Sequence, residues 1–88
     1  MMTLATKDYG RNSMIRVYPN PVQENLSFDL PDFFFPLEVV IYDISGRLIR
    51  SINYEEENNV KVGNLKPGVY IVKFISQDKS LQVKFIKK

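Results

Sequence analysis

Residues 69–88, VYIVKFISQDKSLQVKFIKK, contain two segments in which apolar and polar side chains alternate, separated by the polar run Gln77-Asp78-Lys79. Apolar side chains occupy every second position of both segments: Tyr70, Val72 and Phe74, then Leu81, Val83 and Phe85. Successive side chains of a strand point to opposite faces of a sheet, so this period of two predicts β-structure with one buried face. We therefore expect two antiparallel strands, Val69 to Ser76 and Ser80 to Lys87, joined by a tight turn.

The rest of the chain repeats this pattern of short apolar segments with turn residues between them, and no ten-residue stretch has helical periodicity. The segment from Leu37 to Asp43 is apolar on both faces, which predicts a central strand. The other expected strands are Ile15–Tyr18, Asn25–Leu30, Leu48–Tyr54 and Val60–Leu65. Seven short strands with short connections predict an all-β fold, an immunoglobulin-like antiparallel β-sandwich, with a small barrel as the alternative.

Three connections have recognisable turn chemistry. Pro19-Asn20-Pro21 ends the first strand because proline has no N–H to donate to a ladder, and we expect Asn20 to cap a turn amide. Between Asp43 and Arg47 we expect a hairpin in which Asp43 binds turn amides and Gly46 takes a positive φ. Lys66-Pro67-Gly68 predicts a type II turn.

Composition limits the function classes. The chain has 88 residues, enough for one domain, and it contains neither cysteine nor histidine. The absence of both removes thiolate sites, the usual zinc ligand and the commonest general base, so we expect no cofactor, no metal and no enzymatic activity. Residues 60–88 carry seven lysines and one acidic residue. These lysines alternate with apolar residues and are interpreted as the solvated faces of strands rather than as a nucleic-acid site.

Two further segments have simple interpretations. Residues 1–14 lack apolar periodicity and a secretory signal pattern, and we expect a linker or tether there, with the folded domain spanning 15–88. Glu55, Glu56 and Glu57 are adjacent rather than alternating, which is the wrong spacing for a calcium-binding loop. We interpret them as a solvated turn.

Four groups of residues, taken in order, resemble the type A C-terminal sorting domain of the type IX (Por) secretion system of Bacteroidetes. They are Val17-Tyr18-Pro19-Asn20-Pro21; Ile41-Tyr42-Asp43 with Gly46-Arg47; Leu65 with Pro67-Gly68-Val69-Tyr70; and Lys84-Phe85-Ile86-Lys87-Lys88. Each group alone is common in β proteins. Their order and the basic C-terminal end make the resemblance specific.

The resemblance implies a non-catalytic signal at the end of a larger secreted precursor with cargo domains N-terminal to it. Such domains pass through the periplasm, are recognised by outer-membrane shuttle proteins and the translocon, and leave the cargo secreted or at the cell surface. A sortase-like cysteine peptidase removes the domain, which by analogy places the cut within residues 1–14. Within these groups the resemblance implies the following recognition motif: Pro19, Asn20, Pro21, Tyr42, Asp43, Gly46, Pro67, Gly68, Tyr70, Lys84, Phe85, Ile86, Lys87 and Lys88.

Several alternatives stay open. Phe33, Phe34 and Phe35 either plug the open end of the sandwich or form an exposed patch for a translocon component or a weak homodimer. The basic end of the last strand is interpreted as edge charges at Lys84, Lys87 and Lys88, or as a strand that joins a partner's sheet with Phe85 and Ile86 in pockets. An accessory carbohydrate-binding or adhesive module is the alternative function.

Overall fold

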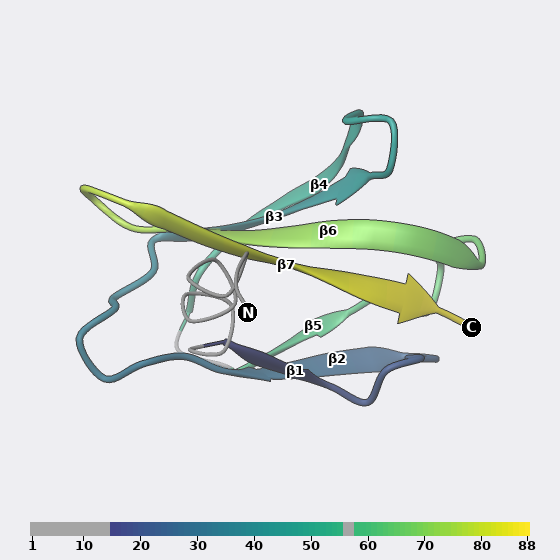
Figure 1. Ribbon diagram of the computed structural model, residues 1–88, viewed down its shortest axis with the longest axis horizontal. Helices are drawn as coiled ribbons and strands as arrows, with labels where there is room; N and C mark the ends of the chain where they lie inside the picture. The colour runs from purple at the N-terminus through teal and green to yellow at the C-terminus, as the bar shows by residue number, and fades with distance from the viewer. Residues whose placement is uncertain (1–14, 56–57) are drawn as a thin grey trace, which may run out of the picture.

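The computed structural model describes residues 15–55 and 58–88, and these residues form seven strands in two antiparallel sheets. The four-stranded sheet has the order β4-β3-β6-β7 and lies over the three-stranded sheet β1-β2-β5 (Figure 1). The bounds are β1 (Arg16–Tyr18), β2 (Asn25–Asp29), β3 (Glu38–Asp43), β4 (Leu48–Asn53), β5 (Asn59–Lys61), β6 (Gly68–Ile75) and β7 (Ser80–Lys87). This confirms the predicted immunoglobulin-like β-sandwich. The described residues include no helix long and apolar enough to cross a membrane.

The core follows the predicted alternation. In β6, Tyr70, Val72 and Phe74 are buried, and Phe85 of β7 pairs with Tyr70 in register. Phe74 faces the other sheet, where the centre of its ring lies 4.7 Å from the centre of the Phe28 ring in β2. Strand β3 is central, as its apolar residues predicted, because it pairs with β4 on one side and β6 on the other.

The first strand leads into a change of sheet. Strand β1 pairs with β2 in the three-stranded sheet, whereas Val22 forms a parallel bridge with Lys87 of the four-stranded sheet. Pro19-Asn20-Pro21 therefore carries the chain from one sheet to the edge of the other, and both X-Pro bonds in it are cis.

The predicted type II turn at Lys66-Pro67-Gly68 is wrong. Gly68 has a φ of +157°, far from the value of about +80° that such a turn requires, and it already pairs with Lys87 as the first residue of β6. The hydrogen-bonded turn lies earlier, where the Leu65 N–H donates to the Val62 carbonyl at 3.0 Å. Strand β5 consequently ends at Lys61 instead of continuing to Leu65.

Some predicted segments lie outside the described residues. These are the linker over residues 1–14, with the cleavage position expected within it, and Glu56 and Glu57 of the acidic turn.

Candidate recognition surface

The Pro19-Asn20-Pro21 segment and the end of the last strand lie together. The Ile86 N–H donates to the Asn20 Oδ1 at 2.8 Å, and the Val22 N–H donates to the Ile86 carbonyl at 2.9 Å. The Lys88 N–H donates to the Val22 carbonyl, also at 2.9 Å. We call these four residues, Asn20, Val22, Ile86 and Lys88, the terminal clamp. It joins the first and last of the four motif groups into one surface.

The terminal clamp changes the role expected for Asn20. The sequence predicted that its side chain would cap an amide of its own turn. Instead its Oδ1 accepts a hydrogen bond from the N–H of Ile86 in β7, 66 positions later in the chain. Pro19, Asn20 and Pro21 are all exposed, while Val22 is fully buried. Val22 therefore anchors a segment whose preceding three residues remain accessible to a partner.

The end of β7 is less exposed than predicted. Phe85 is fully buried and Lys87 is only 7% exposed, so both side chains point toward the interior. Burial rules out Phe85 as an anchor for a partner's pocket in the folded domain, and it removes Lys87 from the predicted edge charges. Ile86 is 44% exposed, and Lys84 and Lys88 are exposed as predicted.

The clamp covers only part of the outer edge of β7. Alternate backbone groups of an edge strand point away from its neighbour, and at Ile86 and Lys88 these groups are used by Asn20 and Val22. At Gln82 and Lys84 the same alternation directs the N–H and C=O groups outward, and no backbone partner for them occurs among residues 15–55 and 58–88. The accessible part of the edge is therefore the first half of β7.

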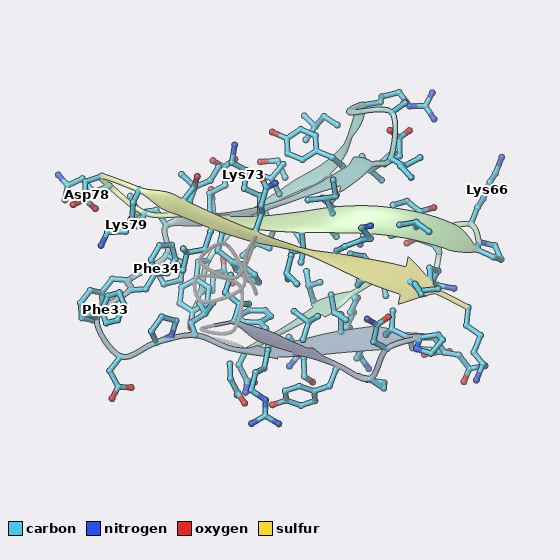
Figure 2. All side chains as sticks on the ribbon, viewed as in Figure 1. Phe33, Phe34, Lys66, Lys73, Asp78 and Lys79 are labelled. Atoms are coloured by element: carbon cyan, nitrogen blue, oxygen red, sulfur yellow. The ribbon has the colours of Figure 1, made fainter. Side chains whose placement is uncertain are left out.

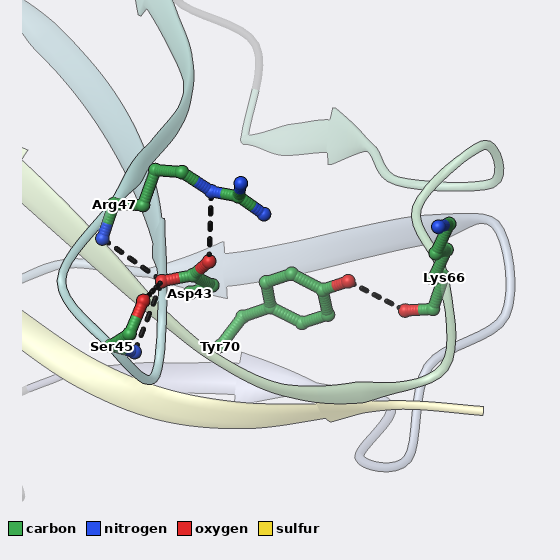
Figure 3. Close-up of polar contacts among 5 residues, drawn as sticks. All are labelled: Asp43, Ser45, Arg47, Lys66 and Tyr70. Carbon is green, nitrogen blue, oxygen red and sulfur yellow. Dashed lines mark hydrogen bonds and ion pairs between the residues drawn. The ribbon is translucent and has the colours of Figure 1, made fainter.

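The hairpin between β3 and β4 forms as predicted (Figure 3). The Asp43 Oδ1 accepts hydrogen bonds from the Ser45 N–H at 3.0 Å, the Ser45 hydroxyl at 2.7 Å and the Arg47 N–H at 2.9 Å. The Arg47 Nε lies 3.2 Å from the Asp43 Oδ2, and Gly46 has a φ of +93°. The bond from the Ser45 hydroxyl, followed by that from the Arg47 amide, lowers the pKa of Asp43. The carboxylate is thus a structural acceptor in the turn.

Tyr70 closes the connection into β6. Its hydroxyl donates to the carbonyl of Lys66, four residues upstream, at 2.6 Å (Figure 3). A tyrosine near the start of a strand that binds the backbone a few residues upstream is the tyrosine corner known from immunoglobulin-like folds. The ring stacks on Phe85 with 5.6 Å between ring centroids. Tyr70 therefore acts in the fold, and the Lys66 carbonyl is held by a side chain rather than by a turn amide.

The three adjacent phenylalanines, of which Figure 2 labels Phe33 and Phe34, divide between core and surface. Phe34 is 4% exposed and belongs to the hydrophobic core, whereas Phe33 and Phe35 are 58% and 74% exposed. Phe33 and Phe35, with Leu37, line a groove of about 460 Å³ beside the β6–β7 turn. The Lys79 Nζ lies 5.3 Å from the centre of the Phe33 ring. Phe34 therefore lies in the core, while Phe33 and Phe35 are exposed, and their role as an interaction patch stays a prediction.

The part of the chain that the structure describes has no cluster of three or more acidic, histidine or cysteine side chains that could hold a metal ion.

Tyr18, like Asp43, has a shifted pKa. The pKa of Tyr18 is raised, mainly because its hydroxyl donates a hydrogen bond to the Asp29 Oδ1 at 3.1 Å. This bond joins β1 to β2 on the outer side of the smaller sheet.

The chain is thus a small β-sandwich in which the first and last motif groups are joined by hydrogen bonds at one end. The family model described as the secretion system C-terminal sorting domain matches residues 16–88, so the chain belongs to this family, the sorting domains of type IX secretion. No curated protein matches the chain. Membership means that the domain is a type IX sorting signal, that it interacts with the type IX machinery, and that it belongs to a secreted or cell-surface protein. Sorting domains of this family are signals and not catalysts.

Proposed function

We propose that residues 15–88 form the folded address of a larger precursor, with residues 1–14 as the linker to N-terminal cargo. In the periplasm an outer-membrane shuttle protein and the translocon recognise the domain. A sortase-like cysteine peptidase then cuts within residues 1–14, and the cargo is released or anchored at the cell surface. Membership of the sorting-domain family supports the sorting step.

The terminal clamp is the observation that carries the proposal. Asn20 and Ile86 come from opposite ends of the folded chain, yet one hydrogen bond joins them at 2.8 Å. A receptor that contacts this surface meets both ends at once, in a geometry fixed by the sandwich. Binding a preorganised surface costs less conformational entropy than ordering two separate flexible segments.

The experiment fuses the whole chain behind a periplasmic reporter in a type IX-competent cell. We expect surface delivery of the reporter, and N-terminal sequencing of the released fragment should place the cut within residues 1–14. Deleting Leu81 to Lys88 should abolish delivery, because this removes most of β7 and one side of the clamp. Unfolding of the truncated chain would mimic this loss, so Asn20→Ala, which leaves all seven strands in place, serves as the second variant.

The same fusion distinguishes the alternative function. An accessory binding module predicts that the isolated chain binds members of a glycan array and that the fused reporter stays in the periplasm. Delivery without glycan binding supports the sorting function.

A further inference from the structure

The outer face of the four-stranded sheet is unusually apolar. In β6 the core residues alternate with Val69, Ile71 and Lys73, which point away from the smaller sheet, and Val40 and Tyr42 of β3 lie on the same outer face. One register row crosses all four strands through Leu48, Tyr42, Ile71 and Lys84. The outer faces of antiparallel sheets are normally polar where they meet water. The apolar residues of this row therefore require an explanation, such as a binding partner that covers them.

The apolar side chains of this row and of the row next to it in β6 and β7 form one group, which we call the outer stripe; Val40, on the same face, is only 4% exposed and is not counted in it. Val69 pairs with Ile86 in the register row next to the pair of Ile71 and Lys84. Paired residues share a face of an antiparallel sheet. Leu48 is 55% exposed and Ile86 is 44% exposed. The outer stripe consists of Tyr42, Leu48, Val69, Ile71 and Ile86.

Lysines border the outer stripe. Lys84 is exposed beside Ile86 on the same face of β7, and Lys73 projects from β6 away from the three-stranded sheet (Figure 2). The nearby carboxylates are engaged: Asp43 by Ser45 and Arg47, and Glu38 by the Ser51 hydroxyl. The hydroxyl of Ser51 is neutral and leaves the negative charge of Glu38 in place, so the positive part of the border is the side that Lys73 and Lys84 form on β6 and β7.

Some residues of the four motif groups whose side chains have no role in the fold lie on or beside the outer stripe, while Pro19, Pro21 and Lys88 are exposed at the terminal clamp. Asn20, Asp43, Tyr70 and Phe85 each have a structural task in the clamp, the hairpin, the tyrosine corner or the core. The side chains of Tyr42, Val69, Lys84 and Ile86 are left on the outer face of the sheet. Three strands, β3, β6 and β7, thus present these four side chains together, and Leu48 of β4 lies beside Tyr42.

We propose that the outer stripe docks a protein of the type IX machinery whose surface is apolar at its centre and carries carboxylates opposite Lys73 and Lys84. This inference rests on the sorting function proposed above, and it adds to the terminal clamp a second contact face, which adjoins the clamp at Ile86. A second copy of the chain fits less well, because packing this face on itself in a two-fold dimer brings two lysine borders together.

The experiment compares delivery of the reporter fused to the whole chain with delivery of matched variants. Leu48→Ser changes the outer stripe, and Leu37→Ser makes the same change at a site that is 61% exposed beside Phe33 and Phe35. Lys84→Glu reverses a charge at the border, and Lys61→Glu reverses one on β5 of the other sheet. We expect Leu48→Ser with Lys84→Glu to lower the delivered fraction by about tenfold, while the two control changes leave it unaltered.

The outcomes separate this inference from the proposed function. If the unchanged fusion is not delivered, the sorting function fails and the docking face fails with it. If the unchanged fusion and the outer-stripe variant are delivered equally, the sorting function stands and the docking face is wrong. Loss of delivery with Leu37→Ser alone would also contradict the inference, since it would move the docking site to the groove.

A folding control accompanies the delivery test. Thermal unfolding of the purified variants must show unchanged midpoints. If Leu48→Ser unfolds, Lys84→Glu alone, at an exposed site, repeats the test. If the unchanged chain sediments as a dimer and Leu48→Ser makes it a monomer, the outer stripe binds a second copy of the chain. That result would contradict docking of a protein of the type IX machinery.

Discussion

The side chain of Asn20 accepts a hydrogen bond from the backbone N–H of Ile86 at 2.8 Å, across 66 positions of sequence. Beside it, Val22 exchanges backbone hydrogen bonds with Ile86 and Lys88. The segment that follows β1 thus protects the end of β7, which is an edge strand of the larger sheet. Edge strands are open to unintended pairing, and a short covering segment limits it.

Asn20→Ala removes the acceptor for the Ile86 N–H. The site is exposed, so water can replace the bond, and we expect a loss of about 1 kcal/mol in the free energy of unfolding. Urea denaturation measures the difference. Asn25→Ala, the same change at an exposed position of β2, is the control and should alter stability less. Equal losses for the two variants would contradict the clamp.

Tyr70→Phe removes only the hydroxyl that binds the Lys66 carbonyl. The bond is partly buried, so we expect a loss of about 1 to 1.5 kcal/mol in the free energy of unfolding with the ring stacking on Phe85 retained. Tyr42→Phe is the matched control, since the described residues contain no partner for the Tyr42 hydroxyl. If Tyr70→Phe and Tyr42→Phe have equal free energies of unfolding, the hydrogen bond of the tyrosine corner does not stabilise the fold.

Phe34 and Phe35 should respond oppositely to truncation. Phe34→Ala leaves a cavity in the core and should lower the free energy of unfolding by about 3 to 5 kcal/mol, a large share of the stability of a small domain. Phe35→Ala removes a side chain that is 74% exposed, and we expect a change within about 0.5 kcal/mol. Calorimetric unfolding of the two variants checks the assignment of core and surface, which a larger loss for Phe35→Ala would reverse.

Asp43 should make stability depend on pH in the acid range. Its hydrogen bonds lower its pKa in the folded chain below the ordinary value of 3.8, so the folded state favours the charged form. The stabilisation is fully present above that value and is lost as the pH falls through the lower pKa of the folded state. Asp43→Asn cannot titrate. The difference in stability between the native chain and this variant should therefore be constant near neutral pH and shrink in strong acid, whereas a difference that grows in acid would contradict the assignment.

Local patterns in the sequence predicted most of the fold. Alternation located β6 and β7 because each strand keeps one face in the core, and the residues of the Asp43 hairpin contain their own hydrogen-bond partners. The turn at Pro67-Gly68 was wrong because the Tyr70 hydroxyl takes the Lys66 carbonyl, which a pattern of turn residues does not reveal.

The surface was harder to predict because it depends on pairing between distant segments. In any turn an asparagine can cap a nearby backbone amide, and this was the role expected for Asn20. The parallel bridge between Val22 and Lys87, which the sequence does not reveal, brings the Ile86 N–H within reach of the Asn20 side chain. In the sequence Lys87 resembles a charge on an exposed strand edge. In β7, however, it lies two positions after Phe85, so its side chain shares the buried face with Phe85 and not the exposed face with Ile86. The apolar residues on both faces of β3 predicted only a central strand, and the outer stripe could be recognised only from the register of β3 with β6 and β7.

The central claim is that this folded chain is an address that the type IX machinery reads. The most direct measurement is the fraction of a reporter exposed outside the outer membrane when residues 1–88 follow it, in a type IX-competent strain and in an otherwise identical strain without the translocon. The account predicts surface exposure in the first strain and retention in the periplasm in the second. Equal distributions in the two strains would contradict it.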